Sequence, residues 1–231
     1  MPSCRNVLKV ESYNVGCRIL IVSTVLVSST CFLFSQGLPA NIFGISGGLG
    51  VTVINATDVV DYINGVSPST NRQDDFASAA EFFGTSELRL SDSWGVKFEY
   101  AYLIKSYAVD AGAGKLDYFY GVHMPTLMAQ YLDFQTGYVF KLGGGLGYHF
   151  ASFSETLQGA TSRDLKSSGL GLKLEAEANT ALGDHLYGMV AGDIRADFMS
   201  TLKDGSGNTL PKNPKMSFFA FGLKFGLIYY F

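Results

Sequence analysis

The sequence predicts an all-β protein: an eight-stranded antiparallel up-and-down transmembrane β-barrel preceded by a signal peptide. Two observations favour this fold class. From residue 41 onward, bulky apolar residues alternate with small or polar ones with a period of two, the period of a β-strand. Charged residues make up only 16% of the chain and aromatic residues 14%, whereas soluble domains carry about 25% charged residues. No run of about 18 apolar residues follows residue 36, which excludes a bundle of transmembrane helices.

The amino-terminal residues predict export. Three basic residues and one acid come first, followed by the apolar run ILIVSTVLVSSTCFLF and the small residues Ser35 and Gly37. A basic region, an apolar region and a small-residue cleavage site together indicate a secretory signal peptide. We therefore divide the chain into a signal peptide, residues 1–37, and an outer-membrane β-barrel domain, residues 38–231. A retained helical anchor is the alternative, and the Ser and Thr content of the apolar run disfavours it.

The cysteines and the net charge narrow the possible partners. All three cysteines, Cys4, Cys17 and Cys31, fall inside the predicted leader. The exported chain then has no disulfide and no cysteine-based metal site. Without the leader it carries 14 basic and 19 acidic residues, a net charge of −5. This charge argues against a nucleic-acid partner.

The alternating segments and their connections indicate the topology. Short connections, SDSW, LDFQTG and LGD, follow the second, fourth and sixth segments, while the first and last connections are long. Short turns at one end and long loops at the other are typical of up-and-down outer-membrane barrels. An even number of strands also puts both ends of the chain on one side. The predicted strands are about residues 41–54, 84–91, 94–107, 115–131, 138–154, 168–181, 185–199 and 217–231.

Side-chain size decides which face of each strand points inward. In the last segment, FFAFGLKFGLIYYF, one face is bulky and continuous, and the other carries Ala220, Gly222, Lys224 and Gly226. The narrow interior of an eight-stranded barrel requires small residues, whereas glycine weakens a solvent-facing strand. We therefore expect the bulky face to point outward to lipid. The alternative is a soluble lipocalin-like carrier, which would place the bulky face inside.

The small faces carry a balanced set of charges that we expect to form a lumen network. Seven acids and seven bases would neutralise each other inside a closed barrel. A plugged, structural network is the favoured interpretation, and a narrow porin-like channel is the alternative. The predicted lumen residues are Glu87, Arg89, Lys97, Glu99, Lys105, Asp117, Lys141, Lys173, Glu175, Glu177, Asp193, Arg195, Asp197 and Lys224.

The signal peptide, the eight alternating strands and the terminal YYF together resemble the OmpA/OmpX-type family of small outer-membrane barrels, a porin-like outer membrane protein beta-barrel domain family. The resemblance covers residues 41–231. It implies a cell-envelope protein in the outer membrane of a Gram-negative-type cell, surrounded by outer-membrane lipid and monomeric. It also implies an insertion signal, read by the barrel-insertion machinery, at Phe221, Phe225, Tyr229 and Phe231. Members of such a family share architecture and differ in activity.

Two constellations are candidates for chemistry. His123 and His149 flank the same predicted turn at similar distances, and two neighbouring imidazoles are potential metal ligands. Some related barrels are lipid A-modifying enzymes with a Ser and a His on one wall, and the stretch HFASFSE offers His149, Ser152 and Ser154. Alternation places this histidine on the opposite face from both serines, which argues against a catalytic pair. We predict no catalytic residue, no metal site and no cofactor.

The long loops are the expected site of function. The first loop, residues 55–83, is rich in acids, and its DDFASAAEFF stretch is interpreted as a short helix. The fourth, residues 200–216, carries three lysines against one acid, so the two loops could dock over the barrel mouth. We expect a structural or surface-interaction role, with an unidentified surface ligand bound through these extracellular loops. The alternatives are the narrow channel, and then the lipocalin-like carrier or the lipid A-modifying enzyme.

Overall fold

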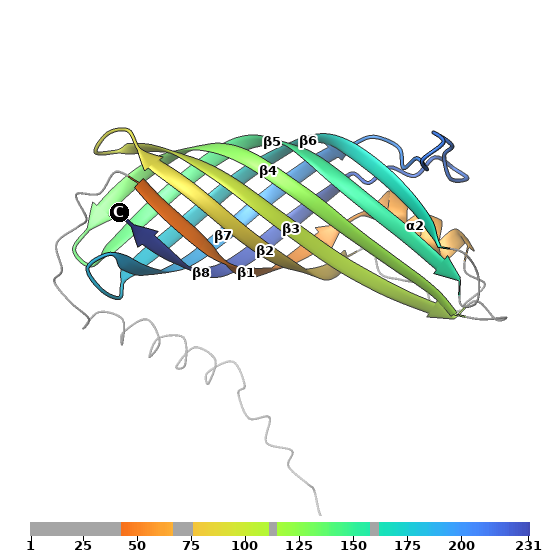
Figure 1. Cartoon of the computed structure of the whole chain (residues 1–231), viewed down its shortest axis with the longest axis horizontal. Helices are drawn as coiled ribbons and strands as arrows, with labels where there is room; N and C mark the ends of the chain where they lie inside the picture. The colour runs from red at the N-terminus through yellow and green to blue at the C-terminus, as the bar shows by residue number, and fades with distance from the viewer. Residues whose placement is uncertain (1–42, 67–75, 111–114, 158–161) are drawn as a thin grey trace, which may run out of the picture. The chain divides into compact units, whose positions relative to one another are not determined.

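The chain forms a closed barrel of eight antiparallel strands in sequence order (Figure 1). The structure is a computed structural model that describes residues 43–66, 76–110, 115–157 and 162–231. The predicted signal peptide and its cysteines lie outside these residues. Among the described residues, no helix is long and apolar enough to cross a membrane. The fold class predicted for the barrel is confirmed.

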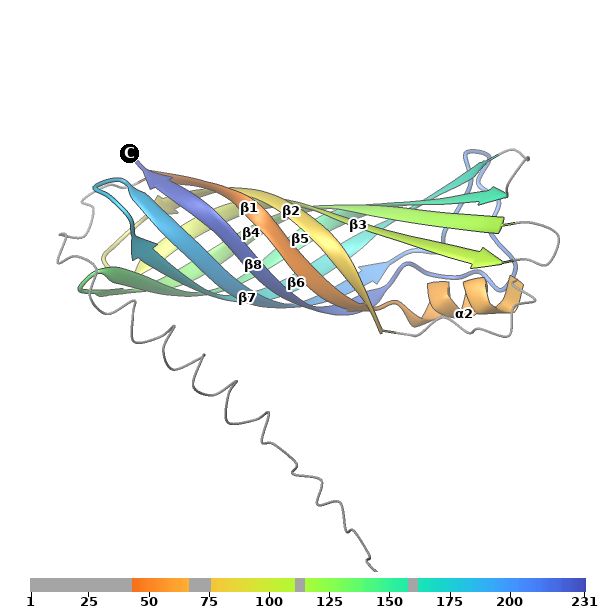
Figure 2. The same cartoon turned by 90° about the horizontal axis from the view of Figure 1, so that it is seen from below.

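Each strand pairs with its neighbour in sequence, and the last pairs with the first. Gly44 is opposite Tyr230 and Asn55 is opposite Phe219, so β1 closes the barrel against β8. Short turns join β2 to β3, β4 to β5 and β6 to β7 at the end where β8 finishes (Figure 2). The elements are β1 (Phe43–Asn55), α2 (Thr57–Val66), β2 (Phe76–Arg89), β3 (Trp94–Asp110), β4 (Lys115–Gln135), β5 (Tyr138–Leu157), β6 (Arg163–Ala181), β7 (Leu186–Met199) and β8 (Phe218–Tyr230).

The first long connection differs from the prediction. Strand β2 begins at Phe76, eight residues before the predicted start, so the part of DDFASAAEFF that the structure describes is strand and the helix prediction is wrong there. The helix lies earlier, at Thr57–Val66. Alternation is weak in this half of β2 because small residues such as Ser78 and Ala80 occupy the outward face. A strand without a bulky outward face carries little period-two signal.

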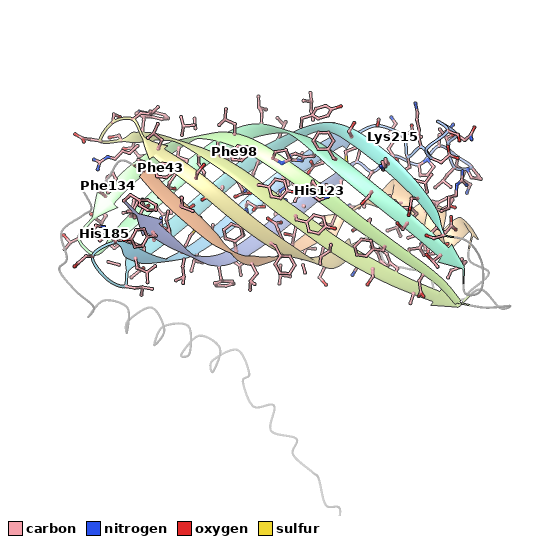
Figure 3. All side chains as sticks on the ribbon, viewed as in Figure 1. Phe43, Phe98, His123, Phe134, His185 and Lys215 are labelled. Atoms are coloured by element: carbon pink, nitrogen blue, oxygen red, sulfur yellow. The ribbon has the colours of Figure 1, made fainter. Side chains whose placement is uncertain are left out.

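Bulky apolar side chains cover the outside of the barrel. Those of β8 run from Phe219 to Phe231 on alternate positions and are 43–59% exposed. Figure 3 shows Phe98 within this band, and Phe43 and Phe134 near the end with the short turns. On β1, β7 and β8 the band begins at the end with the short turns and covers nearly the whole strand, as far as Val53, Phe198 and Phe219. On β6 it begins at the same end and stops at Leu170, part of the way along the strand. A continuous apolar band of this kind is the lipid-facing surface of a membrane barrel.

Four strands continue beyond this band. Strands β3 to β6 have 17, 21, 20 and 19 residues, against 13 or 14 in the other four. Helix α2 packs against the extended strands at the end that carries the long loops (Figure 2). Val59 and Ile63 of the helix belong to one buried apolar cluster with Leu103, Phe153 and Leu202. We call this cluster the apolar cap. It fills the loop end of the barrel.

Candidate functional site: a charged lumen beneath an apolar cap

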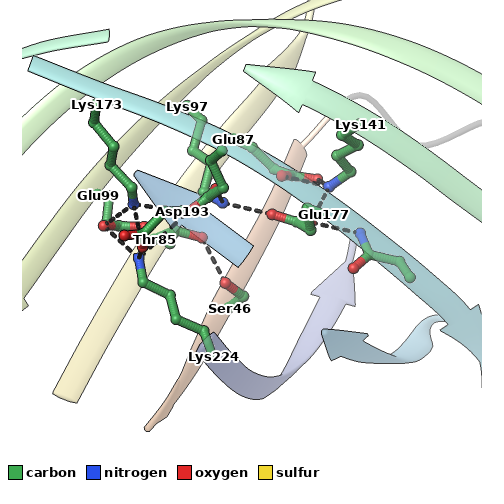
Figure 4. Close-up of polar contacts among 12 residues, drawn as sticks. Ser46, Thr85, Glu87, Lys97, Glu99, Lys141, Lys173, Glu177, Asp193 and Lys224 are labelled. Carbon is green, nitrogen blue, oxygen red and sulfur yellow. Dashed lines mark hydrogen bonds and ion pairs between the residues drawn. The ribbon is translucent and has the colours of Figure 1, made fainter. Parts of the chain in front are cut away.

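The middle of the lumen is filled by charged side chains that meet around the amine of Lys224 (Figure 4). This amine lies 2.8 Å from both carboxylate oxygens of Glu99. Three more carboxylates, contributed by three further strands, lie 3.2–3.3 Å from it; they belong to Glu81, Glu175 and Asp193. Every second residue of a strand points into the lumen. Each of these strands therefore needs only one inward acidic residue, at a similar height along the barrel axis, to bring its carboxylate to the Lys224 amine.

Two further amines share these carboxylates. The Lys97 amine lies 2.6 Å from Glu175 Oε1 and 2.5 Å from Glu177 Oε2. The Lys173 amine lies 2.6 Å from Glu175 Oε2. Glu175 therefore contacts Lys97, Lys173 and Lys224 together. None of these side chains is more than 1% exposed. Because a buried ion loses its hydration, this sharing of partners is what offsets the desolvation of the cluster.

Towards the short turns, the network ends at Lys141. Its amine lies 2.6 Å from Glu87 Oε1 and 2.9 Å from Glu177 Oε1. The Tyr230 hydroxyl donates to Glu87 at 2.6 Å. The Arg89 guanidinium covers the Phe134 ring at 4.3 Å and closes this mouth. The cavity that these residues line holds only about 20 Å³, close to the space needed for one water molecule.

Nearer the apolar cap, a buried histidine forms a separate polar group in the lumen. His149 Nδ1 contacts Asp197 Oδ1, and its Nε2 lies 3.2 Å from Thr126 Oγ1. A Cβ at Gly147 or at Gly171 would overlap the imidazole ring. These two glycines therefore make the space in which His149 lies. This triad was not predicted, because its three members come from three different strands, β4, β5 and β7.

Most of the predicted lumen residues are brought together. Arg89 lies at the mouth with its side chain 25% exposed. Lys105 lies near the loop end, where its amine donates to the Ser78 carbonyl oxygen at 2.7 Å, outside the network. Buried in the lumen are Glu87, Lys97, Glu99, Lys141, Lys173, Glu175, Glu177, Asp193, Arg195, Asp197 and Lys224.

Two residues lie elsewhere than the sequence predicts. Asp117 is exposed on the outside of β4, where the inward positions are Leu116, Tyr118 and Tyr120. Its placement in the lumen was wrong because bulky residues lie on both faces of this part of β4. Glu81 was expected in the first loop, yet it is fully buried and lies 3.1 Å from the Arg195 guanidinium. An earlier start for the second strand would have found it, because it is in phase with Glu87.

The two histidines considered for a metal do not meet. His123 is opposite Phe150 in the β4–β5 pair and is exposed on the outer face, where it stacks on Tyr102 with ring centroids 4.5 Å apart. His149 points into the lumen, so the idea of a two-histidine site is wrong. Ser152 and Ser154 lie on the opposite face of β5 from His149, as expected. Among the described residues, no group of three or more His, Cys, Asp or Glu side chains is arranged to hold a metal ion.

The terminal strand presents its aromatic residues to the outside. Phe221, Phe225, Tyr229 and Phe231 are 45–59% exposed. The Phe231 ring lies 5.0 Å from Tyr229 and 5.8 Å from Phe43, and its backbone N–H donates to the Phe43 carbonyl oxygen at 2.9 Å. The last residue is thereby fixed to β1. Its role as an insertion signal stays a prediction.

The first and fourth connections dock against each other, chiefly through the apolar cap. Ile63 of α2 belongs to the same buried cluster as Leu210 and Met216 of the fourth loop. A polar contact is made by the Lys215 backbone N–H, which donates to Asp58 Oδ2 at 3.4 Å. One turn further along α2, the Tyr62 hydroxyl donates to Glu155 at 3.1 Å. Burial and the nearby Glu155 carboxylate raise the pKa of Tyr62 to about 12.

Comparison with known proteins identifies the architecture. No protein-family model and no curated protein sequence matches the chain. Neisserial surface protein A is 12% identical, with a TM-score of 0.52 over 82% of this chain and 97% of that one. The outer membrane protein OprG from Pseudomonas aeruginosa is 20% identical, with a TM-score of 0.51 over 86% and 99%. A major outer membrane protein from Thermus thermophilus is 15% identical, with a TM-score of 0.53 over 82% and 99%. The chain shares their barrel fold.

Proposed function

Because the chain has the fold of small outer-membrane β-barrels, we propose that it is an integral outer-membrane protein with a closed lumen and a structural or surface-interaction role. The apolar band supports the membrane location. A soluble lipocalin-like carrier would turn its bulky side chains inward, and here they cover the outside. We assign it no catalytic activity.

The observation that carries this proposal is the filled lumen. Three amines and their carboxylates occupy the middle, Arg89 and Phe134 close the turn end, and the apolar cap fills the loop end. A permeating ion would have to separate buried ion pairs such as Lys224–Glu99 and then cross packed apolar side chains. Both steps are costly in a medium of low polarity. The geometry therefore favours a plugged barrel over a narrow channel.

The extended strands support the surface role. Strands β3 to β6 carry their hydrogen-bonded pairing beyond the lipid-facing band, and α2 and the fourth loop pack onto them. A binding surface built on strands is held more rigidly than one built on free loops. Short turns lie at the other end, which the family architecture assigns to the periplasm. We therefore place the interaction surface outside the cell.

Planar-bilayer recording tests the closed lumen. Protein refolded from the barrel domain should give no discrete current steps in molar potassium chloride, while a general porin recorded in the same bilayers conducts. A gel-mobility shift on boiling should accompany this silence, since it shows that the barrel is folded. Reproducible single-channel openings from heat-modifiable protein would contradict the proposal.

A further inference from the structure

We propose that the outward face formed by Lys166, Lys203 and Lys215 binds the phosphorylated headgroup of an outer-leaflet lipid, whose acyl chains lie in the apolar groove below. This inference rests on the proposed membrane location. It adds a ligand of stated chemistry to the outer surface.

The fourth loop is folded as a small sheet that continues β6. Lys166 and Lys203 form an antiparallel bridge, with Lys166 N–H donating to the Lys203 carbonyl oxygen at 2.8 Å and Lys203 N–H to the Lys166 carbonyl oxygen at 3.0 Å. Thr201 in turn bridges to Lys215. Leu202, between Thr201 and Lys203, is fully buried in the apolar cap.

This pairing places three lysines on one face. Directly opposed residues of an antiparallel pair point to the same side, and so do residues two apart on one strand. Lys166, Lys203 and Lys215 therefore share the outward face, opposite Leu202, and all three are exposed. Figure 3 shows Lys215 towards the end with the long loops.

Within the described part of the protein, the three lysine amines form no ion pair. No described carboxylate lies within ion-pair distance of these three amines. Like charges directly opposite each other in a sheet, such as Lys166 and Lys203, destabilise the pairing. The nearest acid along the outward face of β6 is Asp164, which accepts a hydrogen bond from Ser154 Oγ at 2.5 Å. Asp204 of the same loop is held by Arg163 and by its own turn. Asp58 lies beside Lys215, where its Oδ2 accepts a hydrogen bond from the Lys215 backbone N–H at 3.4 Å. Three lysines thus stand against the two carboxylates of Asp164 and Asp58, so the face keeps an excess of positive charge.

The depth of this face points to a lipid headgroup. One outward position below Lys166 lies Ser168, whose hydroxyl is 3.0 Å from the Tyr148 hydroxyl, and the next position is the exposed Leu170. Tyrosine is enriched at the boundary between hydrocarbon and headgroups. Lys166 thus lies immediately above that boundary, where an anionic headgroup attracts a basic residue by about 1 kcal/mol.

A groove for acyl chains begins farther down the same strands. It has a volume of about 600 Å³ and is lined on its outward side by Gly144, Leu172, Leu174, Ile194, Ala196 and Phe219. The small residues Gly144 and Ala196 leave the hollow between the larger ones. Six residues separate Lys166 from Leu172, which is about 15 Å at about 3.3 Å per residue and a tilt of about 40°. An acyl chain can span this distance from a headgroup held by the lysines.

Lipid titration tests the basic face. The barrel, refolded in zwitterionic detergent micelles, is titrated with dimyristoyl phosphatidic acid or dimyristoyl phosphatidylcholine, and bound lipid is counted by native mass spectrometry. We expect preference for phosphatidic acid, and a dissociation constant raised about fivefold by each of Lys166→Gln, Lys203→Gln and Lys215→Gln. Lys212→Gln is the matched control. The Lys212 amine lies near Gly65 of α2, and Lys212 takes no part in the bridges that form this face, so its loss should change the constant less than twofold.

The groove is tested by a variant that fills it. Gly144→Leu should weaken binding of dimyristoyl phosphatidic acid and leave a dihexanoyl analogue unaffected, with folding checked by heat modifiability. Equal binding of the two headgroups, or an equal effect of Lys203→Gln and Lys212→Gln, would overturn the assignment. Competition by inorganic phosphate would show an anion site without lipid and would also overturn it. A folded barrel that gives no current but shows none of this lipid binding would overturn the lipid site and leave the proposed closed lumen intact. A barrel that conducts but binds lipid as expected would overturn the closed lumen and leave the lipid site intact.

Discussion

Lys224 of β8 and Glu99 of β3 meet across the barrel, with the lysine amine 2.8 Å from both carboxylate oxygens. These strands are separated by β1 and β2, so the contact crosses the lumen. It ties opposite walls together and stands at the centre of the buried charge network. Its removal is the most direct probe of that network.

Lys224→Met is expected to destabilise the folded barrel by about 3–5 kcal/mol, because it leaves the surrounding carboxylates without their shared cation. The measurement is urea unfolding of barrel refolded into lipid vesicles. Lys212→Met, which removes an exposed lysine outside the proposed lipid-binding face, should change the free energy of unfolding by less than about 0.5 kcal/mol. A Lys224→Met barrel as stable as the Lys212→Met control would show that the network does not depend on this amine.

Gly171→Ala is expected to cost about 1–3 kcal/mol, because its Cβ would overlap the His149 ring in a packed lumen. Gly192→Ala is the matched control, since the nearest atom to its Cβ would be 3.9 Å away. Equilibrium unfolding measures both. In a double-mutant cycle, His149→Ala should recover much of the Gly171→Ala loss. Full additivity of the two substitutions would argue against the steric explanation.

Trp94, the only tryptophan of the chain, reports where the lipid-facing band ends. It is 55% exposed beside the β2–β3 turn and packs edge-on against Tyr131, with ring centroids 5.7 Å apart. This is the interfacial position that tryptophan prefers. In vesicles, its fluorescence should be quenched more by lipids brominated near the headgroup than by lipids brominated near the chain end. The reverse order would place this end of the barrel in the bilayer centre.

The docking of α2 should weaken in alkali. The pKa of Tyr62 is raised to about 12 by burial and by Glu155, above its usual value near 10. A raised pKa means that the stabilising contribution is complete below pH about 10 and is lost as the pH rises towards 12. Limited proteolysis across this window should show α2 becoming susceptible. Tyr62→Phe, which has no proton to lose, should not show the same rise in susceptibility.

Glu155→Gln provides the complementary control for this titration. It removes the carboxylate that raises the pKa of Tyr62, so the tyrosinate absorbance of that residue should appear at lower pH. If the absorbance curves of Glu155→Gln and the unmodified protein coincide, the carboxylate has no influence on Tyr62. Burial alone would then account for the shift.

Alternation in the eight segments, together with the short and long connections between them, was enough to predict a barrel and its up-and-down strand order. The bulky and small faces of the last segment were enough to predict the outward direction, because a shift of one residue would turn every side chain to the other face. The prediction failed where the two faces are alike. Asp117 lies among bulky residues on both sides, and Glu81 lies in a half-strand of small residues, so neither position has a clear phase.

The sequence by itself determined that this chain forms a closed eight-stranded barrel with charges inside and aromatic residues outside, because period-two alternation is a local property. Only the tertiary structure decided that Lys224 meets Glu99, that His149 lies between Asp197 and Thr126, and that α2 fills the loop end with the fourth loop. Lys166 and Lys203 likewise share a face only through a bridge between distant segments. Such contacts depend on register and closure across the barrel, and the spacing of residues along one strand does not contain that information.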